Sequence, residues 1–187
     1  MRIDRKLNFV VPIVDENDQP YAYVHSTPIS TEVFDKYFLP LARTYSAIFA
    51  LGLGPIAGPR VADKLLKKTS MDIGIWEGAE GVQAGLVSEI HRLTNVVTIG
   101  KAGWETVPWG FAKQNKLLSD ADIAEVEAAI CFFTLTSAVH PKNKLAEYLQ
   151  VASSLWGGQT TSLNSTEFAN SLPISTATAN TGATAAA

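Results

Sequence analysis

The chain has 187 residues, a formal net charge of -3 and a pI near 5.6, so it is long enough for one domain with a substantial core. This mildly acidic balance argues against nucleic acid as the main partner, because binding phosphates requires a net basic patch. The single cysteine, Cys131, excludes an internal disulfide, and we expect its thiol to be buried and inert.

The first residues carry no targeting signal that we recognise. Residues 1–6 are mostly polar or charged and lack the apolar core of a secretory signal. No run of about 18 or more apolar residues occurs anywhere in the chain. We therefore expect a soluble, cytoplasmic protein.

A β-hairpin is predicted at residues 7–27. Residues 7–14 and 20–27 are rich in β-formers and flank a polar turn at residues 15–19. In the second stretch, aromatic rings alternate with small or β-branched side chains, so one face of that strand is aromatic. These rings belong to Tyr21, Tyr23 and His25.

The first helix is predicted to begin at Ser30 or Thr31, either of which can cap it, with Glu32 in the first turn where the helix dipole favours an acid. Pro40 should kink this helix or split it near Leu39, because proline removes a backbone donor. Apolar residues recur at helical spacing and form a wide stripe. They are Val33, Phe34, Tyr37, Phe38, Leu41, Tyr45, Ile48 and Phe49.

A stretch rich in glycine and proline, residues 52–59, is expected to end this helix as a cap and loop. A phosphate-binding loop is disfavoured there, because the stretch follows a helix and its two prolines remove amide donors. Residues 61–68 are predicted to form a short helix, and the basic side chains around them indicate a solvated face.

Residues 80–93 are predicted to form another helix, with Val82, Leu86 and Ile90 on one face. Gly81 and Gly85 lie within it and each weakens a helix by roughly 1 kcal/mol relative to alanine. The pair suggests close packing of the backbone or a less stable element.

Residues 95–99 are β-branched and could form a short strand, whereas residues 100–110 are expected to be loop-like. Trp104 and Trp109 fall in this loop. Together with Trp76, they are expected to cover one end of the core.

The two strongest helix signals come next. Residues 119–122 start a helix with a capping serine and early acids, and His140-Pro141 ends it. Its apolar seam is Ile123, Val126, Ile130 and Phe133, and that of the helix after it is Leu145, Tyr148, Leu149, Ala152 and Leu155. The two helices are predicted to form an antiparallel hairpin.

The segment from residue 157 to residue 187 has one ionisable side chain, Glu167, and consists largely of Ser, Thr, Ala and Asn. Such a composition buries too little apolar surface to fold alone, which predicts a flexible terminus. Leu163, Phe168 and Leu172 are spaced apolar anchors, so the segment also suits docking on a partner or on its own body.

These elements predict a mainly α protein. Residues 1–156 form a compact helical domain with an N-terminal β-hairpin at about residues 7–27. Residues 157–187 form a low-complexity, disordered polar tail.

No catalytic or metal-binding motif is recognisable. The three histidines, His25, His91 and His140, do not lie in ligand motifs, and Cys131 lies in a hydrophobic helix where a thiolate is disfavoured. We expect no catalytic residue, cofactor or metal. A small enzyme without a recognisable motif remains an alternative, which a polar pocket with converging titratable groups would support.

In layout, the chain resembles the tail assembly chaperones of long-tailed, lambda-like bacteriophages. The resemblance is carried by the opening at residues 9–45 and by residues 156–173, which begin WGGQTTSLNSTEF. It implies a non-catalytic protein of the host cytoplasm that binds the tape-measure protein, helps to recruit tail-tube subunits and is absent from the mature virion. In such families, ribosomal frameshifting adds a domain to a minority product. The tail from Gly157 would then be the connector.

A chaperone needs apolar surface that it can expose, so the candidate partner-binding residues are its rings and apolar anchors. They are Phe34, Phe38, Tyr45, Trp76, Trp104, Trp109, Trp156, Leu163 and Phe168. A homo-oligomer is left open. The rival interpretation is a structural virion component, such as a connector or minor tail protein, which would remain in purified particles.

Overall fold

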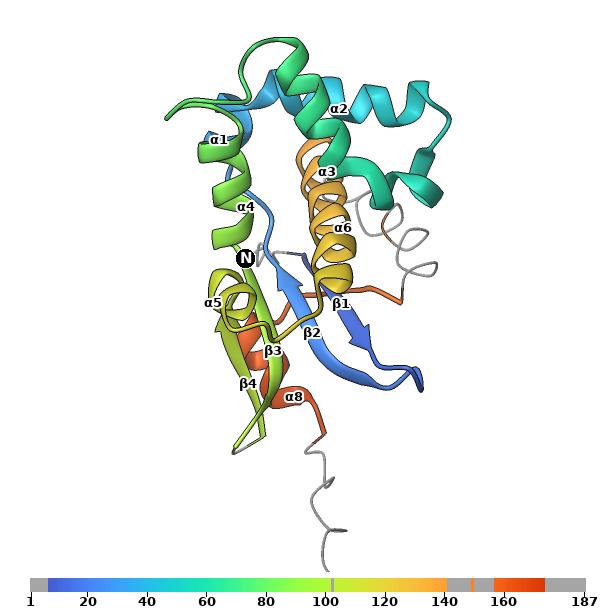
Figure 1. Ribbon diagram of the computed structural model, residues 1–187, viewed down its shortest axis with the longest axis vertical. Helices are drawn as coiled ribbons and strands as arrows, with labels where there is room; N and C mark the ends of the chain where they lie inside the picture. The colour runs from blue at the N-terminus through green and yellow to red at the C-terminus, as the bar shows by residue number, and fades with distance from the viewer. Residues whose placement is uncertain (1–6, 102, 141–148, 150–156, 174–187) are drawn as a thin grey trace, which may run out of the picture.

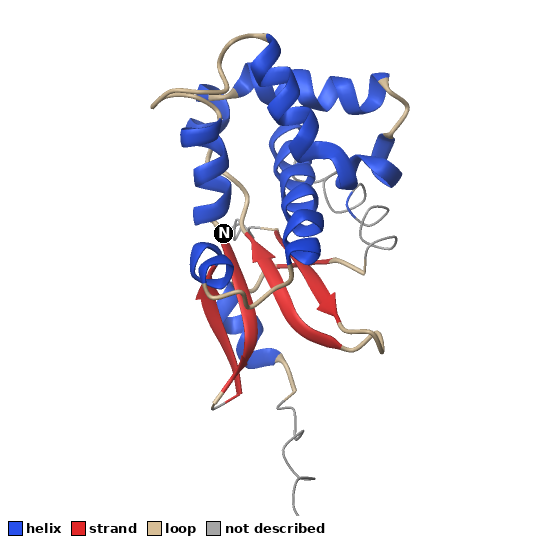
Figure 2. Cartoon of the chain, in the orientation of Figure 1, coloured by secondary structure: helices blue, strands red, loops and turns tan. Residues whose placement is uncertain are grey.

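The computed structural model describes residues 7–101, 103–140, 149 and 157–173, which form a mixed α/β fold (Figures 1 and 2). A five-stranded antiparallel sheet has the order β4-β3-β2-β1-β5. The expectation of a mainly α fold is therefore corrected: the predicted hairpin is present as two strands of a larger sheet. The strands are β1 (Asn8–Val14), β2 (Pro20–Ser26), β3 (Thr94–Gly100), β4 (Gly103–Pro108) and β5 (Gln159–Thr161).

The helices lie at one end of the sheet and on both of its faces. In Figure 1, α6 rises from the sheet to the helical end of the molecule, where it meets α2 and α3. No helix among the described residues is long and apolar enough to span a membrane. The helices are α1 (Thr31–Lys36), α2 (Phe38–Ala50), α3 (Gly54–Asp72), the π-helix η1 (Gln83–Val87), α4 (Ser88–Arg92), α5 (Trp109–Gln114), α6 (Asp120–Val139) and α8 (Ser165–Ser171).

Side chains along the first two strands point alternately to the two faces of the sheet, and both faces are covered. Phe9 and Val11 of β1 point toward α6, where the Phe9 ring stacks on Phe133 with centroids 5.2 Å apart. Val10 points the other way and packs with Phe168 of α8. A strand with both faces covered needs apolar residues at successive positions, and residues 9–11 are all apolar.

The predicted split in the first helix is confirmed, two residues earlier than expected. α1 ends at Lys36, Tyr37 has φ -110° and ψ 21°, and α2 begins at Phe38. Pro40 therefore lies in the first turn of α2, where backbone N–H groups have no partner within the helix. Because the helix breaks just before this turn, Pro40 costs little stability there.

The loop expected at residues 52–59 is largely helical, which corrects that expectation, and the helix predicted at residues 61–68 is confirmed as part of the longer α3. The chain turns at Gly52, whose φ is +70°, and α3 then begins at Gly54 and contains Pro59. Packing explains this result: a Cβ at Gly58 would come within 2.6 Å of the Phe132 ring. Glycine thus lets α3 lie close to α6, and this contact outweighs the local helix-breaking preference.

The helix predicted at residues 80–93 is present, but it starts at Gln83 and its first turn is the π-helix η1. Gly85 explains part of this conformation. A Cβ there would overlap the buried Tyr37 hydroxyl, so the absence of a side chain lets η1 lie against Tyr37, the residue between α1 and α2.

The segment expected to be a loop instead contains the end of β3, β4 (Gly103–Pro108), which pairs with β3, and the start of α5. Pairing with β3 accounts for β4, because alternate residues such as Thr106 find partners on the neighbouring strand. Trp109 is only 1% exposed and lies within the core, whereas Trp104 lies on the α8 side of the sheet. Trp76, Trp104 and Trp109 therefore do not cover one end of the core together.

The long helix predicted after Ser119 is confirmed as α6. Ser119 and Asp122 form a capping box, and His140 is the C-cap. The helix predicted to follow it lies outside the described residues, apart from Leu149, which is buried in the cluster around Phe9 and Phe133.

Residues 157–173, which we call the docked segment, are packed on the sheet. β5 pairs with residues 8–10 of β1, and α8 begins with a capping box between Asn164 and Glu167. Of the two docking possibilities, the segment takes the one on its own body. The expectation of a flexible tail is corrected for these residues. Residues 174–187 lie outside the described part, and the division of the chain after residue 156 stays a prediction.

Candidate functional site

Large apolar side chains are exposed at the helical end of the molecule. Phe38 is 55% exposed at the start of α2, and Ile56 is 68% exposed in the first turn of α3. We call these exposed residues, which are spread along α2 and α3, the apolar helical surface. It consists of Phe38 and Leu39 on α2, Leu51 in the following turn, and Ile56 and Met71 on α3.

The apolar stripe of α2 is wider than the core can cover. Leu41, Thr44 and Ile48 are buried against the rest of the molecule. Phe38 and Tyr45, seven residues apart and therefore close to one helix face, run beside this buried row and stay partly accessible. A helix with one apolar row inside and a second row outside has surface left for a partner.

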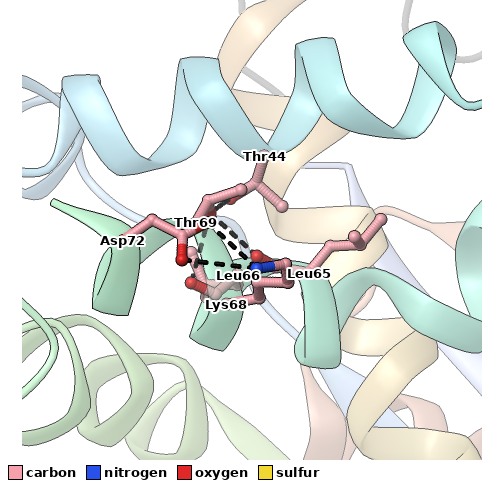
Figure 3. A network of polar contacts seen from close by, with 6 residues as sticks. All are labelled: Thr44, Leu65, Leu66, Lys68, Thr69 and Asp72. Atoms are coloured by element: carbon pink, nitrogen blue, oxygen red, sulfur yellow. Dashed lines mark hydrogen bonds and ion pairs between the residues drawn. The ribbon is translucent and has the colours of Figure 1, made fainter.

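The α2–α3 pair that carries this surface is fixed by polar contacts (Figure 3). The Thr44 and Thr69 hydroxyls lie 2.8 Å apart, joining the two helices. Each hydroxyl also lies within hydrogen-bond distance of a carbonyl of its own helix, Thr44 of Pro40 at 2.7 Å and Thr69 of Leu65 at 2.8 Å. Because a hydroxyl has one proton, one threonine donates across to the other and the second donates to its own helix, which joins α2 to α3.

Three of the nine predicted partner-binding residues lie on α1 and α2. The rings of Phe34 and Phe38 meet edge to face with centroids 5.7 Å apart. The Tyr45 hydroxyl lies 2.6 Å from Nε2 of His140, which ties α2 to the end of α6. Phe34 and Tyr45 are half-buried and pack on the core, whereas Phe38 projects outward.

The remaining predicted residues lie elsewhere. Trp109 and Phe168 are buried, so neither offers accessible surface in the described fold, and their role in binding stays a prediction. Trp104 donates Nε1–H to the Pro173 carbonyl and helps to hold the docked segment. Leu163 is exposed in that segment, Trp76 is half-buried after α3, and Trp156 lies outside the described residues.

Four of the five residues of the apolar helical surface were missed by sequence reasoning: Leu39, Leu51, Ile56 and Met71. The sequence does carry a signal for two of them. Leu51 and Ile56 lie at a turn rich in glycine and proline, where polar residues are the rule. Apolar side chains at a turn are an indication of contact with another surface.

A second feature is an apolar pocket of about 240 Å³ enclosed by α3, η1, α4 and α6. Its apolar wall comes from all four helices, together with Trp76 from the loop after α3. Polar groups complete the lining at several points. The apolar lining residues are Leu66, Trp76, Val87, Ile90, Ile130 and Cys131, and the polar ones are Asp63, Lys64, Lys67, Gln83, His91 and Glu127.

Glu127 is the most perturbed carboxylate at this pocket. Its Oε1 accepts a hydrogen bond from Lys113 Nζ at 2.6 Å and lies 3.4 Å from His91 Nε2. The His91 contact and the Lys113 ammonium lower the pKa of Glu127 to about 2 against the opposing effect of burial. At neutral pH this corner of the pocket therefore holds a carboxylate already paired with cationic or donor groups.

Cys131 lies in the same lining, and its environment disfavours a reactive thiolate. Burial raises the pKa of the Cys131 thiol, and the Asp63 carboxylate raises it further. The thiol is therefore protonated at neutral pH and behaves as a small apolar group in the pocket wall.

Two side chains of the sheet hold the docked segment through the backbone carbonyl of Leu163. The Leu163 carbonyl accepts hydrogen bonds from Asn8 Nδ2 at 2.8 Å and from His25 Nε2 at 3.0 Å. Desolvation lowers the pKa of His25, so its neutral form is favoured in the folded protein. His25 thus acts as a neutral donor that fastens the segment to the sheet.

Within the described ranges, no group of three or more His, Cys, Asp or Glu side chains is placed to hold a metal ion. Comparison with protein-family models, curated proteins and solved structures found no match to this chain.

Proposed function

We propose that this protein is a tail assembly chaperone of a long-tailed bacteriophage, which binds the tape-measure protein without catalysing a reaction. The observation that carries the proposal is the apolar helical surface. A holdase works by covering apolar stretches of its client, and this requires complementary apolar surface that water would otherwise meet. Phe38, Leu39, Leu51 and Ile56 supply such surface on a helical frame.

The client chemistry follows from this surface. An apolar helical stretch of the tape-measure protein would lay its apolar side chains against α2 and the start of α3, in the manner of a helix packing on exposed helices. Each large apolar side chain buried in this way contributes about 1.5–3 kcal/mol. Burying a few of them is enough to offset the cost of association.

The wider assembly role is part of the same proposal. The protein acts in the host cytoplasm, helps to recruit tail-tube subunits through a longer frameshifted product, and leaves before the virion is complete. Because residues 157–173 are packed on the sheet, a connector to an added domain is proposed only for the residues after Pro173.

Co-expression with the tape-measure protein of the same genome tests the surface. Full-length protein carrying Phe38→Ser and Leu39→Ser should capture at least tenfold less tape-measure protein in a pull-down. The matched control is Phe111→Ser, which removes an equally exposed ring from α5, outside the apolar helical surface. Capture unchanged in the double variant, or lost equally in the control, would refute this surface.

A further inference from the structure

The pocket between α3, η1, α4 and α6 is too small for a typical free ligand. Pockets that bury drug-sized molecules or cofactors measure about 300–1,000 Å³, whereas this one measures about 240 Å³. Its size suits one large side chain delivered by another protein. Hot spots of protein interfaces are anchors of this kind, seated in desolvated pockets.

The charges that line the pocket balance. Asp63 and Glu127 contribute two carboxylates, and Lys64 and Lys67 contribute two ammonium groups. A charged occupant would leave one of these groups with a like charge nearby, so the lining favours a neutral occupant. The largely apolar wall supplies the rest of the binding free energy.

One acceptor at the pocket lacks a hydrogen-bond donor. Oδ1 of Asp63 is buried and has no hydrogen-bond donor within the described part of the chain, and the nearest ammonium, on Lys64, is 3.8 Å away. The Asp63 side chain is still one third exposed, so a rotation of the carboxylate can present an oxygen to an occupant. A buried acceptor without a donor costs free energy, which a donor on the occupant would recover.

The wall also favours an aromatic ring. Trp76 can meet another ring edge to face, and the Cys131 sulfur lines the same space, where sulfur–aromatic contacts are favourable. The pocket is bordered by η1, and π-helical turns occur frequently at functional sites.

We infer that this pocket receives a tryptophan or tyrosine side chain of a partner protein: a neutral aromatic ring with one hydrogen-bond donor, which reaches Asp63. That the partner is the tape-measure protein rests on the proposed function. The chemistry of the occupant rests on the pocket alone.

Indole and benzofuran test the chemistry, because they share a shape and only indole carries a donor. Added to the full-length ¹⁵N-labelled protein, indole should shift the amide and indole signals of Trp76 and the amides of η1.

Val87→Phe fills the pocket and should abolish these shifts. Gln83→Phe, at an exposed position on the rim, is a second blocking variant in case Val87→Phe unfolds. Absence of shifts in the wild type would overturn the inference.

The donor contact is tested by the ratio of the two affinities. One hydrogen bond corresponds to about a 2- to 10-fold preference for indole, and Asp63→Ala should reduce the ratio to about one. Asp72→Ala, which removes an exposed carboxylate from the same helix, should leave it unchanged. A preference that survives in Asp63→Ala would overturn the assignment of Asp63.

The partner is tested in the pull-down. Val87→Phe or Gln83→Phe should lower capture of the tape-measure protein, and free indole should compete with it. Full capture by both blocking variants would overturn the partner side chain as occupant. If the wild type captures no tape-measure protein while indole binds, the proposed function fails and the pocket chemistry stands.

Discussion

Single atoms decide how closely the helices of this protein pack. Gly58 lets α3 approach the Phe132 ring, and Gly85 leaves room for the Tyr37 hydroxyl. The sequence indicates close packing at Gly85, but it does not identify the partner, Tyr37, which lies between α1 and α2, about fifty residues earlier. A sequence shows that space is needed and not which atom occupies it.

Replacing Gly85 by alanine is expected to destabilise the protein by about 1–3 kcal/mol, because the new methyl group overlaps the buried Tyr37 hydroxyl. Gly110→Ala is the matched control. Among the described residues, no side chain beyond its chain neighbours lies within 4 Å of the place that the new methyl group would take in α5. This variant should therefore be neutral or stabilise by up to about 1 kcal/mol. Urea unfolding of both variants measures the difference, and equal stability of the two would contradict this account.

Glu127 predicts a pH dependence of stability. Its pKa is about 2 in the folded protein against 4.5 for an ordinary glutamate, so between these values the unfolded chain binds more protons than the native one. The stabilisation is therefore complete above about pH 4.5 and is lost as the pH falls toward 2. Glu127→Gln should lose less unfolding free energy than the wild type between pH 5 and pH 3.

The control for this titration is Glu125→Gln, which changes an exposed glutamate on the same helix. It should lose as much unfolding free energy over this pH range as the wild type. A Glu127→Gln variant with the full wild-type loss would show that the Lys113 and His91 contacts do not stabilise the folded state.

At the scale of helices and strands, the sequence predicted those elements whose capping residues or apolar pattern lie within the segment itself. The hairpin strands and α6 were predicted well, since Ser119 and Asp122 form a capping box at the start of α6 and residues 128–136 of that helix are buried as a continuous, mostly apolar run. β4 and the start of α3 were missed. Gly58 packs against Phe132 of a helix far along the chain, whereas Thr106 lies opposite Val97 of the adjacent strand, so β4 was missed although its pairing is local.

The docked segment should depend on one buried ring. Phe168→Ala leaves a cavity under α8 and is expected to lower the free energy of opening this segment by about 3 kcal/mol, typical of a buried aromatic. Leu163→Ala, at an exposed position, should lower it by less than about 1 kcal/mol. Hydrogen exchange of residues 157–173 followed by mass spectrometry measures both. Equal exchange in the two variants would show that Phe168 does not hold the segment.

At the scale of the whole molecule, the polar composition after Gly157 led to a wrong prediction of a flexible tail for the docked segment. Composition indicates only how a segment behaves in isolation. Phe168 and Ala169 are buried only because the sheet offers Val10 and Val97 on its second face. The candidate site was also predictable only in part, because the packing of distant segments decides which residues are exposed. The wide stripe of α2 is visible in the sequence, but whether Phe38 or Trp109 is exposed depends on the assembled fold.

The central claim is that the protein acts on the tape-measure protein during assembly and then leaves. Quantitative mass spectrometry of infected-cell lysate and of purified virions tests it most directly. We predict a complex with the tape-measure protein in the lysate and no copies of this chain in the particles. A stoichiometric amount of the chain in purified virions would contradict the chaperone role and identify a structural component instead.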